Sequence, residues 1–494
     1  MHDPEHGAAA LRAQTPLGLR YHYLSGGANT GLGWQTFAGG NGAFVGEYVA
    51  DAQAQGFLSA FSYYMLLQSA PGNAQRDERL QTTVNLGSRP TMTAYFQDLR
   101  TFFVRAAATG VDPIVLHVEP DAWGYAQRSA PGDDARLVPA HVAATGLPEL
   151  AGLPDDVAGF AQAVVRLRDR YAPNVRLGYH VSVWGTGVDI SHSDPPDEEV
   201  DALAARSVAF YRSLRASFDL LFFEFADRDA GYREHVDGEG RLGWWDADDF
   251  LRNVRYVGRI TSALARPGVM WQIPLGNTRM RAMNNTYGHY QDNRVETLLD
   301  PSRAVMTRYR DAGIVAFLFG NAVAGTTCAC DAVGDGITNP APVNGNVGLS
   351  LSADDDGGLF KALVAQYAAR PGLRATSAAN AAPPSTWARF MVRATTTRRG
   401  RVVRVRARVT STTAATATVV VEVRRPGAKV RRAARKQWSS RQFKRRAARP
   451  FTLDWRPPAG TRAGRYGVVV RVIERRGRAT RLTARRATSI VLPR

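Results

Sequence analysis

Short apolar runs alternate with amphipathic segments along about the first 370 residues of the chain. The runs are apolar on both alternations, which is typical of parallel strands buried on both faces. They lie at residues 17–23, 58–66, 114–118, 176–183, 220–225, 269–273 and 314–319. Segments with helical spacing lie between and after them, at residues 43–55, 91–108, 156–171, 198–217, 246–264, 294–311 and 358–369. This alternation predicts an α/β fold in which residues 15–370 form a TIM-like (β/α) barrel.

An open, doubly wound sheet is the alternative α/β arrangement. Such a sheet usually carries a phosphate-binding glycine loop directly after its first strand. Residues 25–29 (SGGAN) do not match that loop, and no helical pattern begins directly after them. The barrel is therefore favoured.

The two ends of the chain differ from this pattern. Residues 1–14 are polar and alanine-rich and are predicted to be disordered, and residues 371–386 are small and proline-bearing, as in a linker. Residues 387–494 alternate apolar and polar positions between turns rich in Pro, Gly and charge. This last pattern predicts an all-β, immunoglobulin-like sandwich as a separate accessory domain.

Charge is divided unevenly between the two predicted domains. The whole chain has a net charge of +19, yet residues 387–494 hold 31 Lys and Arg against 3 Asp and Glu. Such a surface suits an anionic polymer or a cell surface. Nucleic acid is a less favoured partner because stacking aromatics are sparse there and no nucleic-acid motif is present. A solvated, arginine-rich surface without a partner is the alternative.

Carboxylates follow two of the predicted strands. Glu119 and Asp121 come directly after the run at 114–118, and Glu224 closes the run at 220–225. Charged groups are excluded from a barrel core, so these side chains are expected at the carboxyl-terminal rim, where barrels carry their chemistry. We predict Glu119 and Glu224 as a catalytic pair, with Asp121 raising the pKa of Glu119 by its charge. Asp77 and Asp227 are reserve candidates.

Other strand ends carry aromatic, imidazole and amide side chains, a mixture that suits a sugar, whose rings stack on aromatic faces and whose hydroxyls need polar partners. Cleavage of a glycosidic bond requires two carboxyl groups across such a cleft. The predicted substrate-binding residues are Tyr23, His180, Trp184, Asp227, Gln272, Asn277 and His289.

One strand resembles a known family. Residues 115–121, which end in Glu-Pro-Asp, resemble a strand of glycoside hydrolase family 6, whose members are cellulases on a distorted seven-stranded barrel. The resemblance implies a catalytic acid aspartate in the loop after the preceding strand, where this chain has Asp77. The family's late Lys-Pro-Gly-Gly-Glu stretch has no counterpart at residues 318–322 (LFGNA). The resemblance therefore covers one strand and the general layout of a TIM-barrel glycoside hydrolase.

Structural roles remain open for several of these residues. Asp121 is a good helix N-cap, Glu224 between two phenylalanines is equally consistent with a buried loop-orienting carboxylate, and His117 is expected in the core. The favoured function is hydrolysis of a β-linked poly- or oligosaccharide. The alternative is a non-catalytic surface protein that binds carbohydrate or polyanion.

Cofactors and location are weakly constrained. The proposed chemistry needs no cofactor, and no metal site is predicted because Cys328 and Cys330 have no nearby histidines to complete a zinc site. No signal peptide or membrane-spanning run is visible. A carbohydrate substrate and a basic domain nevertheless favour an extracellular or cell-surface location.

Overall fold

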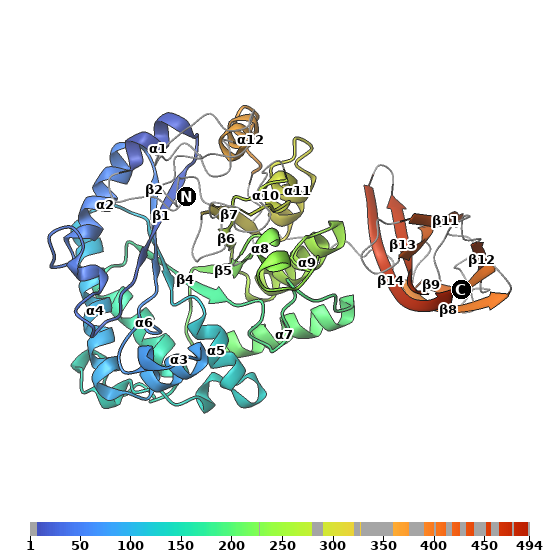
Figure 1. Ribbon diagram of the computed structural model, residues 1–494. Coiled ribbons are helices and arrows are strands. Elements are labelled where there is room, and N and C mark those ends of the chain that lie inside the picture. Colours follow the sequence, from blue (N-terminus) through green and yellow to red (C-terminus); the bar gives the residue numbers. More distant parts are fainter. Residues whose placement is uncertain are drawn as a thin grey trace. The chain divides into compact units, whose positions relative to one another are not determined.

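The computed structural model describes residues 7–226, 228–278, 290–320, 327 and 359–374, together with seven strands between residues 390 and 492 (Figure 1). The chain divides into two compact units, Met1–Ala382 and Pro383–Arg494. The predicted linker at 371–386 includes this division. Each unit is described by itself below.

The first unit is built on seven parallel strands that are hydrogen-bonded in the order in which they occur along the chain. They are β1 (Leu19–Leu24), β2 (Leu58–Tyr63), β3 (Ile114–Val118), β4 (Val175–Val181), β5 (Leu220–Glu224), β6 (Gly268–Ile273) and β7 (Ile314–Phe319). Each lies within or next to one of the predicted apolar runs. The α/β class and the parallel sheet are therefore as predicted.

Helices follow or connect the strands and lie on the outer face of the sheet (Figure 1). The α-helices are α1 (Ala8–Gln14), α2 (Ala43–Ala54), α3 (Glu78–Leu86), α4 (Arg89–Ala108), α5 (Ala122–Ser129), α6 (Val157–Tyr171), α7 (Asp197–Ser213), α8 (Ala230–His235), α9 (Ala247–Leu264), α10 (Arg294–Leu298), α11 (Ala304–Asp311) and α12 (Leu359–Ala368). Short 3-10 turns are η1 (Trp34–Thr36), η2 (Gly72–Ala74), η3 (Pro131–Asp133), η4 (Ala135–Leu137), η5 (Ala143–Thr145) and η6 (Pro148–Leu150).

Two apolar clusters show that the sheet is curled. The large cluster joins the outward-facing residues of the strands to the helices, for example Phe61 and Leu116 to Phe102. The small cluster contains side chains from six of the seven strands, namely Tyr21, Ala60, Val115, Phe222, Val269, Trp271 and Leu318. Side chains of β1 and β7 meet in that cluster although no pairing joins these two strands among the described residues. The sheet is thus a curled, barrel-like wall, and closure into a full TIM barrel remains a prediction.

The prediction of disorder at the N-terminus is wrong for residues 8–14, which form α1. Ala8 and Leu11 are buried in the main cluster, and the Ala8 N–H donates to Asp51 Oδ2 at 3.0 Å. Arg12 lies 3.8 Å from the ring centre of Phe57. Contacts with distant residues thus hold a helix of only 7 residues, which would be marginal by itself.

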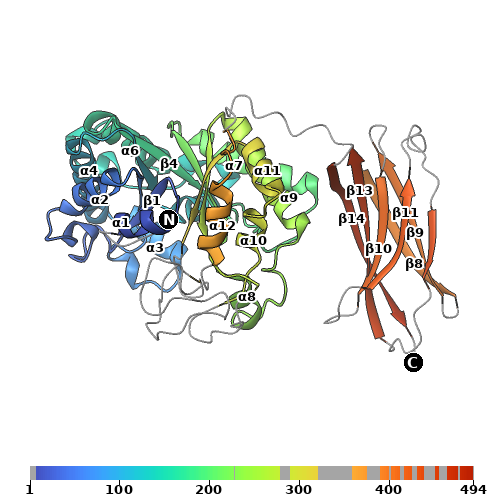
Figure 2. The same cartoon turned by 90° about the horizontal axis from the view of Figure 1, so that it is seen from above.

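The second unit consists of antiparallel strands (Figure 2). They are β8 (Phe390–Arg399), β9 (Val402–Ser411), β10 (Ala417–Arg424), β11 (Arg431–Trp438), β12 (Phe451–Trp455), β13 (Gly464–Arg476) and β14 (Ala479–Leu492). One sheet has the order β11-β10-β13-β14 and the other β12-β9-β8. An all-β unit was predicted here, and its packing as an immunoglobulin-like sandwich stays a prediction.

No helix in the described part of the chain is both long and apolar enough to cross a membrane.

Candidate active site

The inside of the curled sheet becomes polar toward one end. Inward-facing positions near the start of the strands are apolar, such as Leu19, Leu58 and Leu220. Alternation along each strand then places a polar or aromatic set inside, close to the carboxyl-terminal ends: Tyr23, Ser62, His117, His180, Glu224 and Trp271. Because parallel strands end at the same edge of a sheet, this set gathers at the edge where barrels carry their active sites.

Glu224 is the last residue of β5 and is paired in register with Trp271 of β6. Its side chain is 8% exposed. The indole Nε1 of Trp184 donates a hydrogen bond to Glu224 Oε2 at 2.9 Å. A predicted sugar-binding residue and a predicted catalytic residue are therefore in direct contact.

Asp121 is the N-cap residue of α5, but its side chain makes no capping hydrogen bond. Instead the hydroxyl of Tyr64 donates to Asp121 Oδ2 at 3.1 Å. The backbone of Asp121 has a φ of 64°, a left-handed conformation that is uncommon outside glycine. The structural alternative for this residue, a helix cap, is thus not what its carboxylate does.

Asp121 and Glu224 both contribute to the raised pKa values of two tyrosines. The pKa of Tyr23 is raised well above its ordinary value, first by burial and then by electrostatic interaction with Tyr21, Asp121 and Glu224. The pKa of Tyr125 is also raised, first by burial and Glu78 and then by the same two carboxylates. Two carboxylates from different strand ends therefore share one electrostatic neighbourhood.

Aromatic rings surround this neighbourhood. The ring centres of Tyr125 and Trp184 are 4.6 Å apart, and those of Tyr23 and Trp271 are 6.0 Å apart. Gly124 of α5 permits the approach of Trp184, because a Cβ there would lie 2.7 Å from Trp184 Cη2 and 2.4 Å from Ser182 Oγ. Aromatic faces of this kind can stack on a sugar ring.

Glu119, predicted as the catalytic acid, does not join the interior set. It is fully buried, and its carboxylate accepts the backbone N–H groups of Met65 at 3.1 Å and Leu66 at 3.0 Å. Its φ of 44° breaks the strand alternation that would have placed it inside. Burial raises the pKa of Glu119 to about 8, an effect that the two backbone donors oppose. The carboxyl group thus holds the loop after β2, and the catalytic pairing of Glu119 with Glu224 stays a prediction.

Of the remaining predicted binding residues, the structure describes His180, Gln272 and Asn277. His180 is fully buried and inward-facing, whereas Gln272 is 6% exposed and adopts a φ of 60° within a register shift between β6 and β7. Bulges of this kind are common beside active sites. Asn277 is fully buried just beyond β6. Asp227 and His289 lie outside the described residues.

Asp77, the reserve acid, caps a helix. Its side chain accepts the Leu80 N–H at 2.9 Å at the start of α3. The neighbouring Glu78 accepts a hydrogen bond from the Tyr125 hydroxyl. Asp77 is exposed and serves as a structural cap.

Asp229 has a structural role behind this edge of the sheet. It is fully buried, and its carboxylate accepts the N–H groups of Gly276 at 3.1 Å and Thr327 at 2.6 Å. Burial and the charge of Asp292 raise the pKa of Asp229 well above its ordinary value. It thereby joins the loops that follow β5, β6 and β7.

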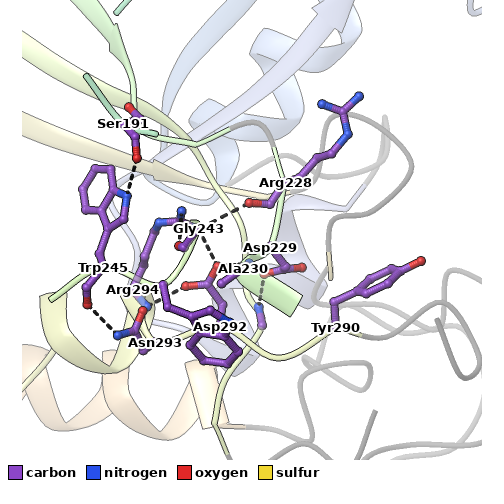
Figure 3. Close-up of polar contacts among 12 residues, drawn as sticks. Ser191, Arg228, Asp229, Ala230, Gly243, Trp245, Tyr290, Asp292, Asn293 and Arg294 are labelled. Carbon is purple, nitrogen blue, oxygen red and sulfur yellow. Dashed lines mark hydrogen bonds and ion pairs between the residues drawn. The ribbon is translucent and has the colours of Figure 1, made fainter. Parts of the chain in front are cut away.

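Asp292 and Arg294 form a fully buried ion pair next to Asp229 (Figure 3). Asp292 also accepts the Ala230 N–H at 2.7 Å, and Arg294 Nη2 donates to the carbonyl of Gly243 at 2.7 Å. The pair was missed because a Gln-Asp-Asn-Arg segment reads as an ordinary polar loop. The ion pair therefore joins α8 and α10 to the loop at Gly243.

Three interior residues were also missed or undervalued, namely Ser62, Tyr64 and Tyr125. Ser62 lies in β2 and Tyr64 directly follows that strand. Because the two residues are two positions apart, strand alternation places both side chains on the inner face, and this pattern could have predicted them. Among the described residues, no three His, Cys, Asp or Glu side chains are grouped so as to hold a metal ion.

Comparison with known proteins adds little. No family model matches the chain, and no curated protein matches it. Solved structures similar to the chain include β-glucuronidase of Bacteroides uniformis, with 8% identity and a TM-score of 0.29 over 90% of this chain and 40% of that one. A glycosyl hydrolase family 2 member of Bacteroides cellulosilyticus has 9% identity and a TM-score of 0.26 over 94% of this chain and 45% of that one.

A β-glucosidase of Thermotoga neapolitana has 13% identity and a TM-score of 0.17 over 60% of this chain and 39% of that one. These neighbours are glycoside hydrolases, and the chain spans under half the length of each. With such low TM-scores and identities, we draw no conclusion about this chain from them. The likeness to family 6 stays confined to residues 115–121.

Proposed function

We propose that the first unit is a glycoside hydrolase that cleaves a β-linked poly- or oligosaccharide, with Asp121 and Glu224 as the two reactive carboxyl groups. The observation that carries the proposal is that both carboxylates accept hydrogen bonds from aromatic side chains at the polar end of the curled sheet, Glu224 from Trp184 at 2.9 Å and Asp121 from Tyr64 at 3.1 Å. The raised pKa values of Tyr23 and Tyr125 support it. One carboxyl group protonates the leaving oxygen as the glycosidic C–O bond breaks. The other either activates a water molecule or attacks the anomeric carbon, and water completes the hydrolysis.

The surrounding residues suit a sugar. The partly exposed side chains of Trp184, Tyr125 and Tyr23 offer ring faces for stacking. Gln272 and Asn277 offer amide donors and acceptors near the end of β6. In this proposal Glu119 contributes stability and takes no part in proton transfer.

The test is hydrolysis of a panel of aryl β-glycosides and β-glucans by the full chain. Wild type should cleave at least one of them, and Asp121→Asn should lower kcat by about 100- to 10,000-fold. Asp77→Asn is the matched control, since it makes the same change at an exposed cap and should retain activity. An active Asp121→Asn variant would remove Asp121 from the mechanism.

A non-catalytic carbohydrate-binding protein is the rival function, because aromatic and amide side chains alone suffice for sugar binding. It predicts that wild type binds a β-glucan, measured by calorimetry, without releasing reducing ends. Binding without cleavage across the whole panel would favour this rival.

The charge of the second unit supports a separate role. Residues 387–494 carry 31 basic against 3 acidic side chains. We propose that this unit holds the protein on an anionic polymer or cell surface outside the cell. The full chain should bind heparin-agarose at about 50 mM salt and elute well below 1 M, with Arg431, Arg432 and Arg435 replaced by Gln lowering the elution salt. Passage of wild type through the column at low salt would reject this role.

A further inference from the structure

Three inward-facing side chains form a line of hydrogen bonds across adjacent strands. Ser62 Oγ of β2 lies 3.2 Å from His117 Nδ1 of β3. His117 Nε2 lies 3.0 Å from His180 Nδ1 of β4. All three residues are buried. The far ring nitrogen, His180 Nε2, is buried and has no hydrogen-bond partner among the described residues.

The rings in this line are held in place by packing. His117 stacks on Phe222 with ring centres 4.1 Å apart and an interplanar angle of 8°. Phe222 can occupy that position because Gly178 has no side chain. A Cβ on Gly178 would lie 2.3 Å from the Phe222 ring. The Trp271 ring packs edge-on against both imidazoles. Its ring centre lies 4.8 Å from that of His117 and 5.4 Å from that of His180.

Both imidazoles are neutral at neutral pH, since burial lowers the pKa of His180 to about 3 and that of His117 well below its usual range. Each ring therefore carries one N–H. If Ser62 donates to His117, then His117 Nε2 donates to His180, and the His180 proton must sit on Nε2. If Ser62 accepts from His117 Nδ1, then His180 Nδ1 donates to His117 Nε2, and His180 Nε2 carries no proton and can only accept. The two histidines must thus share one tautomer.

A second buried polar atom belongs to the Trp271 ring, whose centre lies 5.4 Å from that of His180. The indole Nε1 of Trp271 also has no hydrogen-bond partner among the described residues. An unpaired buried donor or acceptor costs about 1–3 kcal/mol, so such atoms usually have an occupant beside them. A hydroxyl group has suitable chemistry for either atom, because its oxygen accepts from an indole N–H and it either donates to or accepts from an imidazole nitrogen.

We propose that Ser62 and His117 are positioning residues that set the tautomer of His180, and that His180 Nε2 and Trp271 Nε1 together bind a hydroxyl group of the sugar. The ligand part rests on the proposed function. The line of hydrogen bonds from Ser62 through His117 to His180, called the relay below, does not rest on the proposed function. A neutral imidazole and an indole favour an uncharged hydroxyl over a carboxylate or a phosphate at this position.

The relay is tested in the free, full-length protein by proton–nitrogen NMR of its nine histidines, which reports the tautomer of each ring. His117 and His180, assigned by loss of their signals in His117→Gln and His180→Gln, should have the same tautomer. Opposite tautomers would overturn the relay without any variant of Ser62 being needed.

Substitution of Ser62 tests the direction of control. Ser62→Ala should change the nitrogen shifts of His180, which Ser62 does not touch, and Ser62→Thr should restore them. Ser59→Ala is the matched control, since Ser59 is a buried serine of the same strand that faces outward. His180 shifts that are unchanged in Ser62→Ala would overturn the positioning role.

The hydroxyl contact is tested with glycerol as a small neutral polyol and with the best glycoside from the hydrolysis panel. Glycerol should shift His180 Nε2 and the Trp271 indole signal together, and Ser62→Ala should lower kcat/KM about five- to tenfold while Ser59→Ala does not. Unmoved signals would mean that an ordered water alone occupies the position. If wild type cleaves no glycoside, the proposed function fails, and the tautomers still decide the relay.

Discussion

The indole nitrogen of Trp184, in the loop after β4, donates a 2.9 Å hydrogen bond to the carboxylate of Glu224 at the end of β5. The contact joins an aromatic side chain proposed to bind sugar to a carboxylate proposed to act with Asp121. A hydrogen bond from an indole N–H to a carboxylate is charge-assisted and orients the carboxylate. The chemistry proposed for Glu224 therefore depends on Trp184.

Removal of the indole donor should lower activity. Trp184→Phe keeps an aromatic face but loses the bond to Glu224, and we expect kcat/KM to fall about tenfold, the effect of one hydrogen bond to a charged group. The control is Trp244→Phe, since Trp244 Nε1 donates to Glu234 Oε2 at 2.7 Å on a different loop. Equal losses in the two variants would mean that the Trp184 bond has no special part in catalysis.

Close packing at Gly124 should be needed for the position of Trp184. Gly124→Ala places a methyl group against Ser182 and Trp184, so we expect a loss of activity of about tenfold or more and a lower melting temperature. Gly46→Ala is the matched control, since Gly46 lies in α2 with open space around it. That change should leave activity intact and stabilise the fold by about 0.4–1 kcal/mol. Full activity in Gly124→Ala would contradict the packing account.

The stability of the fold should depend on pH through Glu119. Its pKa is about 8 in the folded protein, whereas glutamate in an unfolded chain titrates near about 4.3. Between these values the folded state retains a proton that the unfolded state has lost. The free energy of unfolding should therefore fall as pH rises from about 5 to 8, by at most about 1.4 kcal/mol per pH unit, and level off above that.

Glu119→Gln removes this titration and keeps an oxygen that accepts from Met65 and Leu66. Urea unfolding at pH 5 and pH 8 should show a smaller decline for the variant than for wild type. The variant should also keep its glycosidase activity. An unchanged decline with pH would show that the buried carboxyl is not held in its protonated form.

The buried pair of Asp292 and Arg294 should be essential for stability. Arg294→Met leaves Asp292 without its cation in a fully buried position, and we expect a loss of about 3–5 kcal/mol in the free energy of unfolding. Arg310→Met removes a cation from a partly exposed pair with Asp311 and should cost about 1 kcal/mol or less. Similar melting temperatures for the two variants would contradict the anchoring role.

The parallel sheet could be predicted because its strands are buried on both faces and their apolar runs are separated by helical patterns. The location of Asp121 and Glu224 at strand ends followed from the same reasoning. Glu119 could not be placed, because its left-handed backbone and the N–H groups that hold its carboxylate come from tertiary structure. Alternation alone would have kept it inside the sheet.

The relay from Ser62 to His180 could not be predicted from the sequence for a related reason. His117 was expected to be a core histidine, and it is buried as expected. Its bonds to Ser62 and His180 depend on the register of three strands that are far apart in the sequence. Helix α1 likewise depends on partners in α2 and near β2 that its own sequence does not indicate.

The most direct test of the account is the activity of Glu224→Gln on the glycoside that wild type cleaves best. We expect kcat to fall by about 100- to 10,000-fold with the fold intact. Glu234→Gln, in which the altered carboxylate also accepts from an indole but lies on α8, should remain as active as wild type. A Glu224→Gln variant that keeps wild-type activity would contradict the account.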